Sequence, residues 1–186
     1  MKKIKNLFML AAVAMASTTA TAQMTKTVMV GGAAMYPTKN IIENAVNSKD
    51  HTTLVAAVKA AGLVETLQGK GPFTVFAPTN KAFSKLPAGT VETLLKPENL
   101  KMLQTVLTYH VVAGKLSAQN LMAKIKAGGG KATLKTVAGS EIILSMKGKK
   151  LQIMDTSGGK SYVTIKDVNQ SNGVIHVVDG VLVPKG

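Results

Sequence analysis

The chain has 186 residues, carries a formal net charge of +14 and contains no cysteine. The missing cysteine excludes disulfides and thiolate metal sites, so a packed core must stabilise the fold, and the length fits one domain behind a short leader. All 23 basic residues are lysine and tryptophan is absent. This composition argues against a protein that reads nucleic-acid sequence, because arginine makes the bidentate contacts to guanine. The positive charge favours anionic partners instead.

The first 22 residues have the pattern of an export signal. Lys2, Lys3 and Lys5 precede an apolar run at residues 7–16, and residues 20–22 (Ala-Thr-Ala) supply a small-x-small cleavage site. The apolar run is shorter than the ~20 residues that span a bilayer. We therefore predict cleavage after Ala22, a secreted or periplasmic location, and no transmembrane segment after the leader is removed.

Short helices are predicted in the first half of the mature chain. Residues 23–38 are expected to form a loose N-terminal arm, with an edge strand at 27–30 as the alternative. Apolar residues at helical spacing then predict a helix capped by Asn40, a second over residues 54–61, and a further turn over 63–67. Gly62 and Gly69 are placed to end the last two.

The centre of the chain predicts one buried strand and three helices. β-Branched and aromatic residues at 73–76 are typical of a strand, which Pro78 would end, and Thr79 is placed to cap a short helix. The next helix is expected to begin near Pro97 and to bury Leu100, Leu103 and Leu107. Another is expected to begin after Ser117 and to end at glycines 128–130.

From Lys131 onward the apolar period changes from helical to two, which predicts β-strands. Strands are expected over residues 131–136, 142–144, 151–153 and 162–165, with a turn at 155–159, and a last apolar stretch follows Asn172-Gly173. We expect Asn172-Gly173 to form a left-handed turn, Asp179-Gly180 to form a tight hairpin or a bulge, and Val181 and Val183 to fill the sheets. Helices concentrated early in the chain and antiparallel strands concentrated late in it indicate the α+β class.

Three segments resemble a known family. Residues 71–83 (GPFTVFAPTNKAF), 109–112 (YHVV) and 172–184 (NGVIHVVDGVLVP) are similar in content, order and spacing to the signature segments and the central Tyr-His motif of the fasciclin (FAS1) domain. The resemblance covers roughly residues 39–184 and implies a single FAS1 domain at 39–186. It implies a wedge or sandwich of two β-sheets with helices packed along one side and edge. The residues that carry it are expected to specify the fold rather than to bind a ligand: Phe73, Thr74, Val75, Phe76, Pro78, Thr79, Asn80, Phe83, Tyr109, His110, Asn172, Gly173, His176 and Asp179.

The three histidines are the natural candidates for catalysis or metal binding. His51 follows an aspartate at a polar helix start and is expected to be solvated or to cap the helix. His110 lies between apolar neighbours, where an imidazole can bridge a helix end to a strand by donating and accepting hydrogen bonds. His176 is expected to point to the same strand face as its valine neighbours. No local motif pairs them with a carboxylate, and no nucleophile elbow, zinc helix or phosphate loop is present. We predict no catalytic residue, no metal site and no cofactor.

Two features are candidate interaction surfaces. The first is lysine density around the glycine loop and on the predicted hairpin at 146–149, an ordinary solvated face being the alternative. The second is Asp167-Val168, where animal fasciclin proteins carry an Asp-aliphatic pair that has been linked to integrin recognition. Here Ile165 and Lys166 precede it rather than an acidic-Pro pair. The candidate lysines are Lys124, Lys126, Lys147, Lys149 and Lys150.

The predicted function is that of an exported, non-enzymatic protein in cell adhesion or matrix association. Its partners are expected to be a surface protein or an anionic glycan. The alternative is a carrier for a hydrophobic small molecule such as a carotenoid or a lipid, because a few fasciclin-type proteins bind carotenoids. The methionines at 102, 122, 146 and 154 suit an adaptable apolar site, although simple core filling also explains them.

Overall fold

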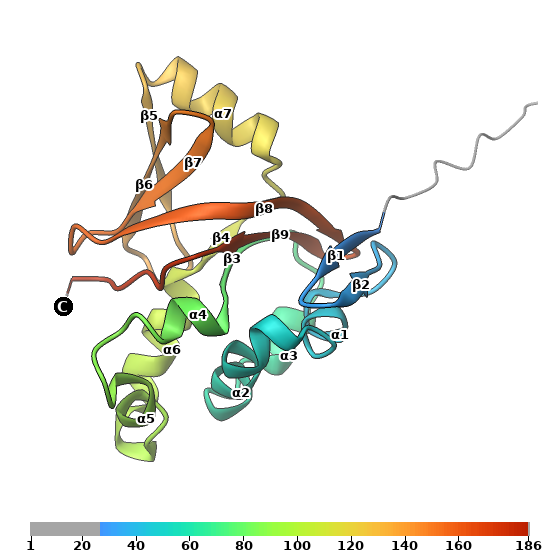
Figure 1. Ribbon diagram of the computed structural model, residues 1–186, viewed down its shortest axis with the longest axis vertical. Helices are drawn as coiled ribbons and strands as arrows, with labels where there is room; N and C mark the ends of the chain where they lie inside the picture. Colours follow the sequence, from blue (N-terminus) through green and yellow to red (C-terminus); the bar gives the residue numbers. More distant parts are fainter. Residues whose placement is uncertain (1–26, 186) are drawn as a thin grey trace, which may run out of the picture.

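The computed structural model describes residues 27–185 (Figure 1). The predicted leader, residues 1–22, and the first part of the predicted arm, residues 23–26, lie outside the described residues. Within residues 27–185, no helix has the length and apolar character that crossing a membrane requires.

The part of the arm that is described forms a β-hairpin, where the sequence predicted a loose segment. β1 (Val28–Val30) pairs antiparallel with β2 (Ala33–Met35), and the two glycines between them both have positive φ. Val30 and Met35 are buried in the core. β1 agrees with the alternative prediction of an edge strand at 27–30, whereas β2 and the hairpin turn were not predicted, because strands of three residues are too short to show a period of two.

The helices follow the predicted order with one addition. They are α1 (Ile41–Ala45), the 3-10 turn η1 (Lys49–His51), α2 (Thr52–Ala60), α3 (Val64–Gln68), α4 (Asn80–Phe83), α5 (Thr90–Leu94), η2 (Pro97–Asn99), α6 (Leu100–Tyr109) and α7 (Ala118–Ala127). The predicted caps are present: Asn40, Thr79 and Ser117 each accept a hydrogen bond from the backbone N–H of the third helical residue.

Two helical details differ from the sequence prediction. The helix α5 was not predicted: it has five residues, and its apolar side chains Val91 and Leu94 are only partly buried against the first cluster. Leu100, expected on the buried side of the next helix, is 40% exposed, whereas Leu103 and Leu107 are buried. Leu100 is the first residue of α6 and lies at the exposed junction with η2.

The strands of the main sheet are β3 (Phe73–Pro78), β4 (Val111–Ala113), β5 (Lys131–Lys135), β6 (Glu141–Lys147), β7 (Lys150–Met154), β8 (Lys160–Gln170) and β9 (Gly173–Val178). Their order is β4-β3-β9-β8-β7-β6-β5. β3 and β9 run parallel, and every other neighbouring pair is antiparallel. The predicted α+β class is confirmed.

The long strand β8 divides the seven strands into two sheets that form a wedge. The first sheet contains β4, β3, β9 and the later part of β8, and the second contains the start of β8 with β7, β6 and β5. The first residues of β8, 160–162, pair with β7, and from Val163 onward it pairs with β9. Two register shifts interrupt the second ladder, and Asp167 between them has φ 59°. Such irregularities bend and twist a strand, so β8 leaves one sheet and enters the other.

Two hydrophobic clusters lie on opposite faces of β3 and β9. Val75, Ala77 and Ile175 face the cluster beneath helices α1, α2 and α6, whereas Phe76 and Val178 face the cluster between the two sheets, which α7 covers. Figure 1 shows α1–α6 on one side of β3 and β9 and α7 on the other. Both faces of these strands are therefore buried, which explains their nearly continuous apolar sequences.

The end of the chain differs from its prediction. Asp179-Gly180 forms neither a hairpin nor a bulge: β9 ends at Val178, and residues 181–185 have no regular secondary structure. The Asp179 backbone N–H donates to the Tyr162 carbonyl at 3.1 Å, and its carboxylate accepts from the Tyr162 N–H at 2.8 Å. Val183, expected to fill the sheet, is 39% exposed.

Candidate functional site

Asn172 fastens the turn before β9 to α1 and to the C-terminal end of α3. Its amide nitrogen donates to the carbonyls of Leu67 at 2.7 Å and Gly69 at 2.9 Å, and its amide oxygen accepts from the N–H of Ile41 at 3.0 Å. Neither Asn172 nor Gly173 has a positive φ, so the expected left-handed turn is wrong. The asparagine acts through its side chain, as a buried connection between α1, α3 and β9.

Gly173 allows a close backbone approach. A Cβ atom at this position would overlap the carbonyl oxygen of Phe73 and lie 3.0 Å from its carbonyl carbon and nitrogen. The two residues are partners in the parallel ladder between β3 and β9. Phe73 itself is half-buried beside the first cluster.

Asn80 and Thr74 hold loops against the sheet. The amide oxygen of Asn80 accepts from the Thr53 N–H at 3.0 Å, and its nitrogen donates to the Lys49 carbonyl and the Thr52 hydroxyl, both at 2.9 Å. The buried Thr74 hydroxyl donates to Gly114 and accepts from the Leu116 N–H. Thr79 caps α4, buried Pro78 ends β3, and Phe83 fills the first cluster.

The central Tyr-His pair connects the two sheets. The hydroxyl of the fully buried Tyr109 donates to the Glu141 carbonyl at 2.7 Å and accepts from the Thr156 N–H at 3.1 Å. His110 Nε2 accepts from the Leu182 N–H at 2.9 Å, which leaves Nδ1 to donate to the Val106 carbonyl at 2.7 Å. Burial lowers the pKa of His110 to about 4, although the Val106 carbonyl and the Asp155 charge oppose the shift. The ring is therefore neutral at pH 7.

His176 has the same kind of environment on the other side of the wedge. Its Nδ1 accepts from the Asp167 N–H at 3.3 Å, and its Nε2 donates to the Leu116 carbonyl at 2.8 Å. The ring stacks on Phe76 with centroids 5.7 Å apart. Burial lowers its pKa, against the opposing effects of the Leu116 carbonyl and the Asp167 charge.

His51 is buried, so the expectation of a solvated role is wrong. Its Nδ1 lies 2.9 Å from the Ser48 hydroxyl, and Nε2 has no hydrogen-bond partner among the described residues. Burial lowers the pKa of His51; the Ala77 carbonyl, which does not complete a hydrogen bond to Nε2, and the Asp50 charge act in the opposite direction. His51 lies at the junction of η1 and α2, and η1 is too short for its buried face to be recognised from sequence.

Two of the three histidines have no ring nitrogen available for catalysis. The rings of His110 and His176 use both nitrogens in hydrogen bonds to the backbone, so neither has a nitrogen free to act on a substrate. Across residues 27–185, no three His, Asp or Glu side chains are grouped to hold a metal ion.

Asp167-Val168 is not an exposed recognition pair. Val168 is 1% exposed and belongs to the first hydrophobic cluster. The Asp167 carboxylate accepts from the N–H of Ala118, the first residue of α7, at 2.7 Å. The pair therefore anchors α7 to the bend of β8, and the prediction of an interaction surface is wrong for Val168.

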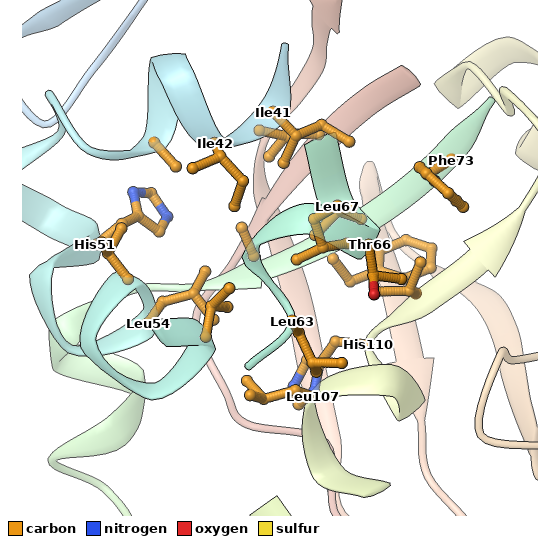
Figure 2. Close-up of a pocket in the computed structure, with 18 of the residues that line it drawn as sticks. Ile41, Ile42, His51, Leu54, Leu63, Thr66, Leu67, Phe73, Leu107 and His110 are labelled. Carbon is orange, nitrogen blue, oxygen red and sulfur yellow. The ribbon is translucent and has the colours of Figure 1, made fainter. Parts of the chain in front are cut away.

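An apolar cavity lies between the helices and the first sheet (Figure 2). It has a volume of ≈ 60 Å³ and is lined by side chains from α1, α2, α3, α6 and β3, including Ile42, Leu54, Leu67 and Leu107. Figure 2 shows the His51 ring at one side of this space and His110 at the other. Pockets for small molecules usually measure about 300–1,000 Å³, so the cavity as it stands is too small for a carotenoid.

The candidate lysines are all exposed. Lys124 and Lys126 lie in the last turns of α7, whose C-terminus leads into β5. Lys147 and Lys150 are direct partners across the β6–β7 hairpin, and Lys149 lies in its turn. Because β5 pairs with β6 from Lys131↔Ser145 onward, the glycine loop and the hairpin turn lie at the same end of the second sheet. We call Lys124, Lys126, Lys131, Lys147, Lys149 and Lys150 the basic tip.

A family model for the Fasciclin domain matches residues 49–184. The chain belongs to the fasciclin family. It is 46% identical over 159 residues to protein sll1483 of Synechocystis, which covers 86% of this chain and 81% of that protein. It is 37% identical over 145 residues to the immunogenic protein MPB70 of Mycobacterium bovis, covering 75% of this chain and 66% of that protein.

The fold is similar to a solved fasciclin structure. A FAS1 domain pair from the insect cell adhesion molecule fasciclin I superposes with a TM-score of 0.68 at 19% identity, covering 77% of this chain and 50% of that chain. The predicted recognition as a FAS1 domain is thus confirmed.

Sequence reasoning missed one structural anchor of this fasciclin domain. Asp155 is buried, and its carboxylate accepts from the N–H groups of Ser157, Gly159 and Val183 at 2.7–3.0 Å. The local part of this arrangement is an Asx turn at residues 155–159, where the sequence predicted a turn without assigning this role to the Asp155 side chain. The bond to the last segment is long-range and has no local signal.

Proposed function

We propose that this protein is an exported, non-enzymatic fasciclin protein that attaches to surfaces by binding anionic groups of a partner protein or glycan through its lysines. The observation that carries the proposal is that those lysines are exposed and that few of them lie near an acidic side chain. Four of the 23 lysines precede residue 27, and the remaining 19 are all exposed. Within residues 27–185, only Lys85 and Asp179 lie within ion-pair distance, at 3.9 Å. The other ammonium groups are available to a partner.

The basic tip concentrates this charge. Lys147 and Lys150 face each other directly across two strands, an arrangement that like charges make unfavourable by about 0.2–1 kcal/mol. Lys149 adds a third charge in the turn between them. An anionic partner would relieve this repulsion on binding. We therefore expect the basic tip to bind such a partner more tightly than isolated lysines do.

Two further considerations support the proposal. His110 and His176 are used in structural hydrogen bonds, which favours a function of the surface over one of a catalytic cleft. The solved structure to which the fold is similar comes from a cell adhesion molecule.

The test is retention of the mature protein on heparin-agarose as a function of salt. We expect firm retention at low ionic strength that decreases as salt is raised, because exposed charges are screened. A variant with Lys147, Lys149 and Lys150 changed to Gln should elute at lower salt. The matched control changes Lys59, Lys96 and Lys101, which carry the same charge on the helical side. Negligible retention of the wild-type protein at low salt, or equal shifts for both variants, would contradict the proposal.

The carrier hypothesis remains a separate prediction. The apolar cavity of ≈ 60 Å³ would have to open severalfold to hold a lipid or carotenoid. Native mass spectrometry of protein purified from its own exported fraction tests it. A bound molecule of stoichiometric mass would favour the carrier, and a clean apo mass would count against it.

A further inference from the structure

The two sheets separate where β7 and β8 diverge, and a groove lies in the gap. The β7–β8 ladder ends at Gln152↔Tyr162, although β7 extends back to Lys150 and β8 extends on to Gln170. Figure 1 shows β7 and β8 spreading apart from this point with α7 across the open side. Residues of all three elements and of the β6–β7 hairpin line an open groove of ≈ 380 Å³.

The inner surface of the groove is partly apolar and adaptable, with Tyr162 and Thr164 beside its apolar side chains. Met122 from α7 and Met146 from β6 line it and remain 38% and 36% exposed. Leu151 and Val163 line it from the two diverging strands. Methionine side chains are flexible and polarisable, so exposed pairs of them suit partners of varied shape. Neither methionine is needed to fill a core, because both keep more than a third of their surface in contact with solvent.

The charged residues of the groove all have one sign. Lys149, Lys150 and Lys166 line it, and no Asp or Glu of the described residues does. The nearest acidic side chain in sequence, Asp167, is held by the Ala118 N–H at the start of α7. An anionic group entering the groove would therefore meet three ammonium groups, and the one neighbouring carboxylate, Asp167, is engaged by the N–H of the lining residue Ala118.

We propose that this groove binds an extended, acidic peptide segment of a partner protein that carries at least one large apolar side chain. The apolar side chain would pack between Met122 and Met146, and the flanking carboxylates would pair with Lys149, Lys150 and Lys166. The groove is partly open to solvent, which suits a chain crossing it better than a small molecule that needs enclosure. This inference rests on the proposed function and specifies the partner class for one part of the lysine-bearing surface.

The experiment titrates isotope-labelled mature protein with the peptide acetyl-Glu-Asp-Leu-Asp-Leu-Glu-amide and follows backbone amide shifts by NMR. We expect saturable shifts confined to residues around Met122, Met146, Leu151 and Lys166. Two matched peptides separate the contributions: one replaces the acids by Gln and Asn, and one replaces Leu by Ser. Each should bind about tenfold more weakly or not at all.

Variants distinguish this inference from the general proposal. Changing Met122 and Met146 to Ser leaves the charge unaltered, so heparin retention should stay the same while affinity for the peptide falls about tenfold. The control is Met102→Ser, a 58% exposed methionine on α6. Retention on heparin together with shifts that are equal for the Leu and Ser peptides, or spread over all lysines, would overturn the groove and leave the general proposal standing. Binding to anionic phosphatidylglycerol vesicles that the Met variant loses, without peptide binding, would overturn it in favour of a membrane.

Discussion

Acidification should destabilise this protein through the protonation of His110. In the folded state the ring is buried, accepts a hydrogen bond from Leu182 through Nε2, and has a pKa of about 4. In the unfolded chain the pKa returns to about 6.5. The unfolded state therefore takes up a proton between pH 6.5 and 4 while the folded state does not. The stability that the neutral ring confers is complete above pH 6.5 and is lost as the pH falls toward 4.

The size of the effect follows from this difference in pKa. Each pH unit between the two values costs about 1.4 kcal/mol, so the free energy of unfolding should fall by about 2 kcal/mol at pH 5 and about 3 kcal/mol at pH 4. His51 and His176 also have lowered pKa values and act in the same direction. The contribution of His110 must therefore be isolated by comparison with a variant.

Urea denaturation of the wild type and His110→Asn at pH 7.5, 5 and 4 provides this comparison. The asparagine can keep the donor to the Val106 carbonyl but cannot titrate, and it leaves the Leu182 N–H without its acceptor. We expect the variant to be less stable by roughly 1–3 kcal/mol at pH 7.5. Between pH 7.5 and 4 it should lose about 3 kcal/mol less than the wild type. If both proteins lost the same free energy over this range, the assignment of a neutral, buried His110 would be refuted.

Two other substitutions test the connections made by the signature segments. Asn172→Ala leaves one buried N–H and two carbonyls without partners and should lower the free energy of unfolding by about 2–4 kcal/mol. Asn169→Ala at an exposed position of the preceding strand β8 is the control, and equal midpoints in urea would contradict the connecting role. Gly173→Ala should cost at least about 2 kcal/mol, because the new methyl group overlaps the Phe73 backbone. Here Ser171→Ala, at an exposed neighbour, is the control, and a Gly173 variant as stable as wild type would show that β3 and β9 can separate.

Local signals predicted most of the helices and strands. Asn40, Thr79 and Ser117 were recognised as caps because the capping hydrogen bond joins residues only three apart. The helix α5 was not predicted because it has only five residues and its apolar positions, Val91 and Leu94, are too few to establish a helical period. The pairing of β1 with β2 was not predicted, because each strand contains only three residues.

The site could be predicted only in part, because its geometry depends on contacts between distant residues. The exposure of the lysines follows from their chemistry, but the opposition of Lys147 and Lys150 depends on the register of a hairpin. Asp167 and Val168 are adjacent in sequence, yet the positive φ of Asp167 turns its carboxylate to α7 while Val168 enters the core. The partner of His176, the Leu116 carbonyl, lies 60 residues away and has no mark in the local sequence.

The attachment of the last residues has a mechanical consequence for a protein that binds surfaces. Leu182, Val183 and Lys185 donate in turn to His110, Asp155 and Thr156. A tensile force entering at Lys185 would reach the 155–159 turn and the end of α6 before it reached the central strand β9. The force would thus be divided between both sheets, and it would act on β9 last.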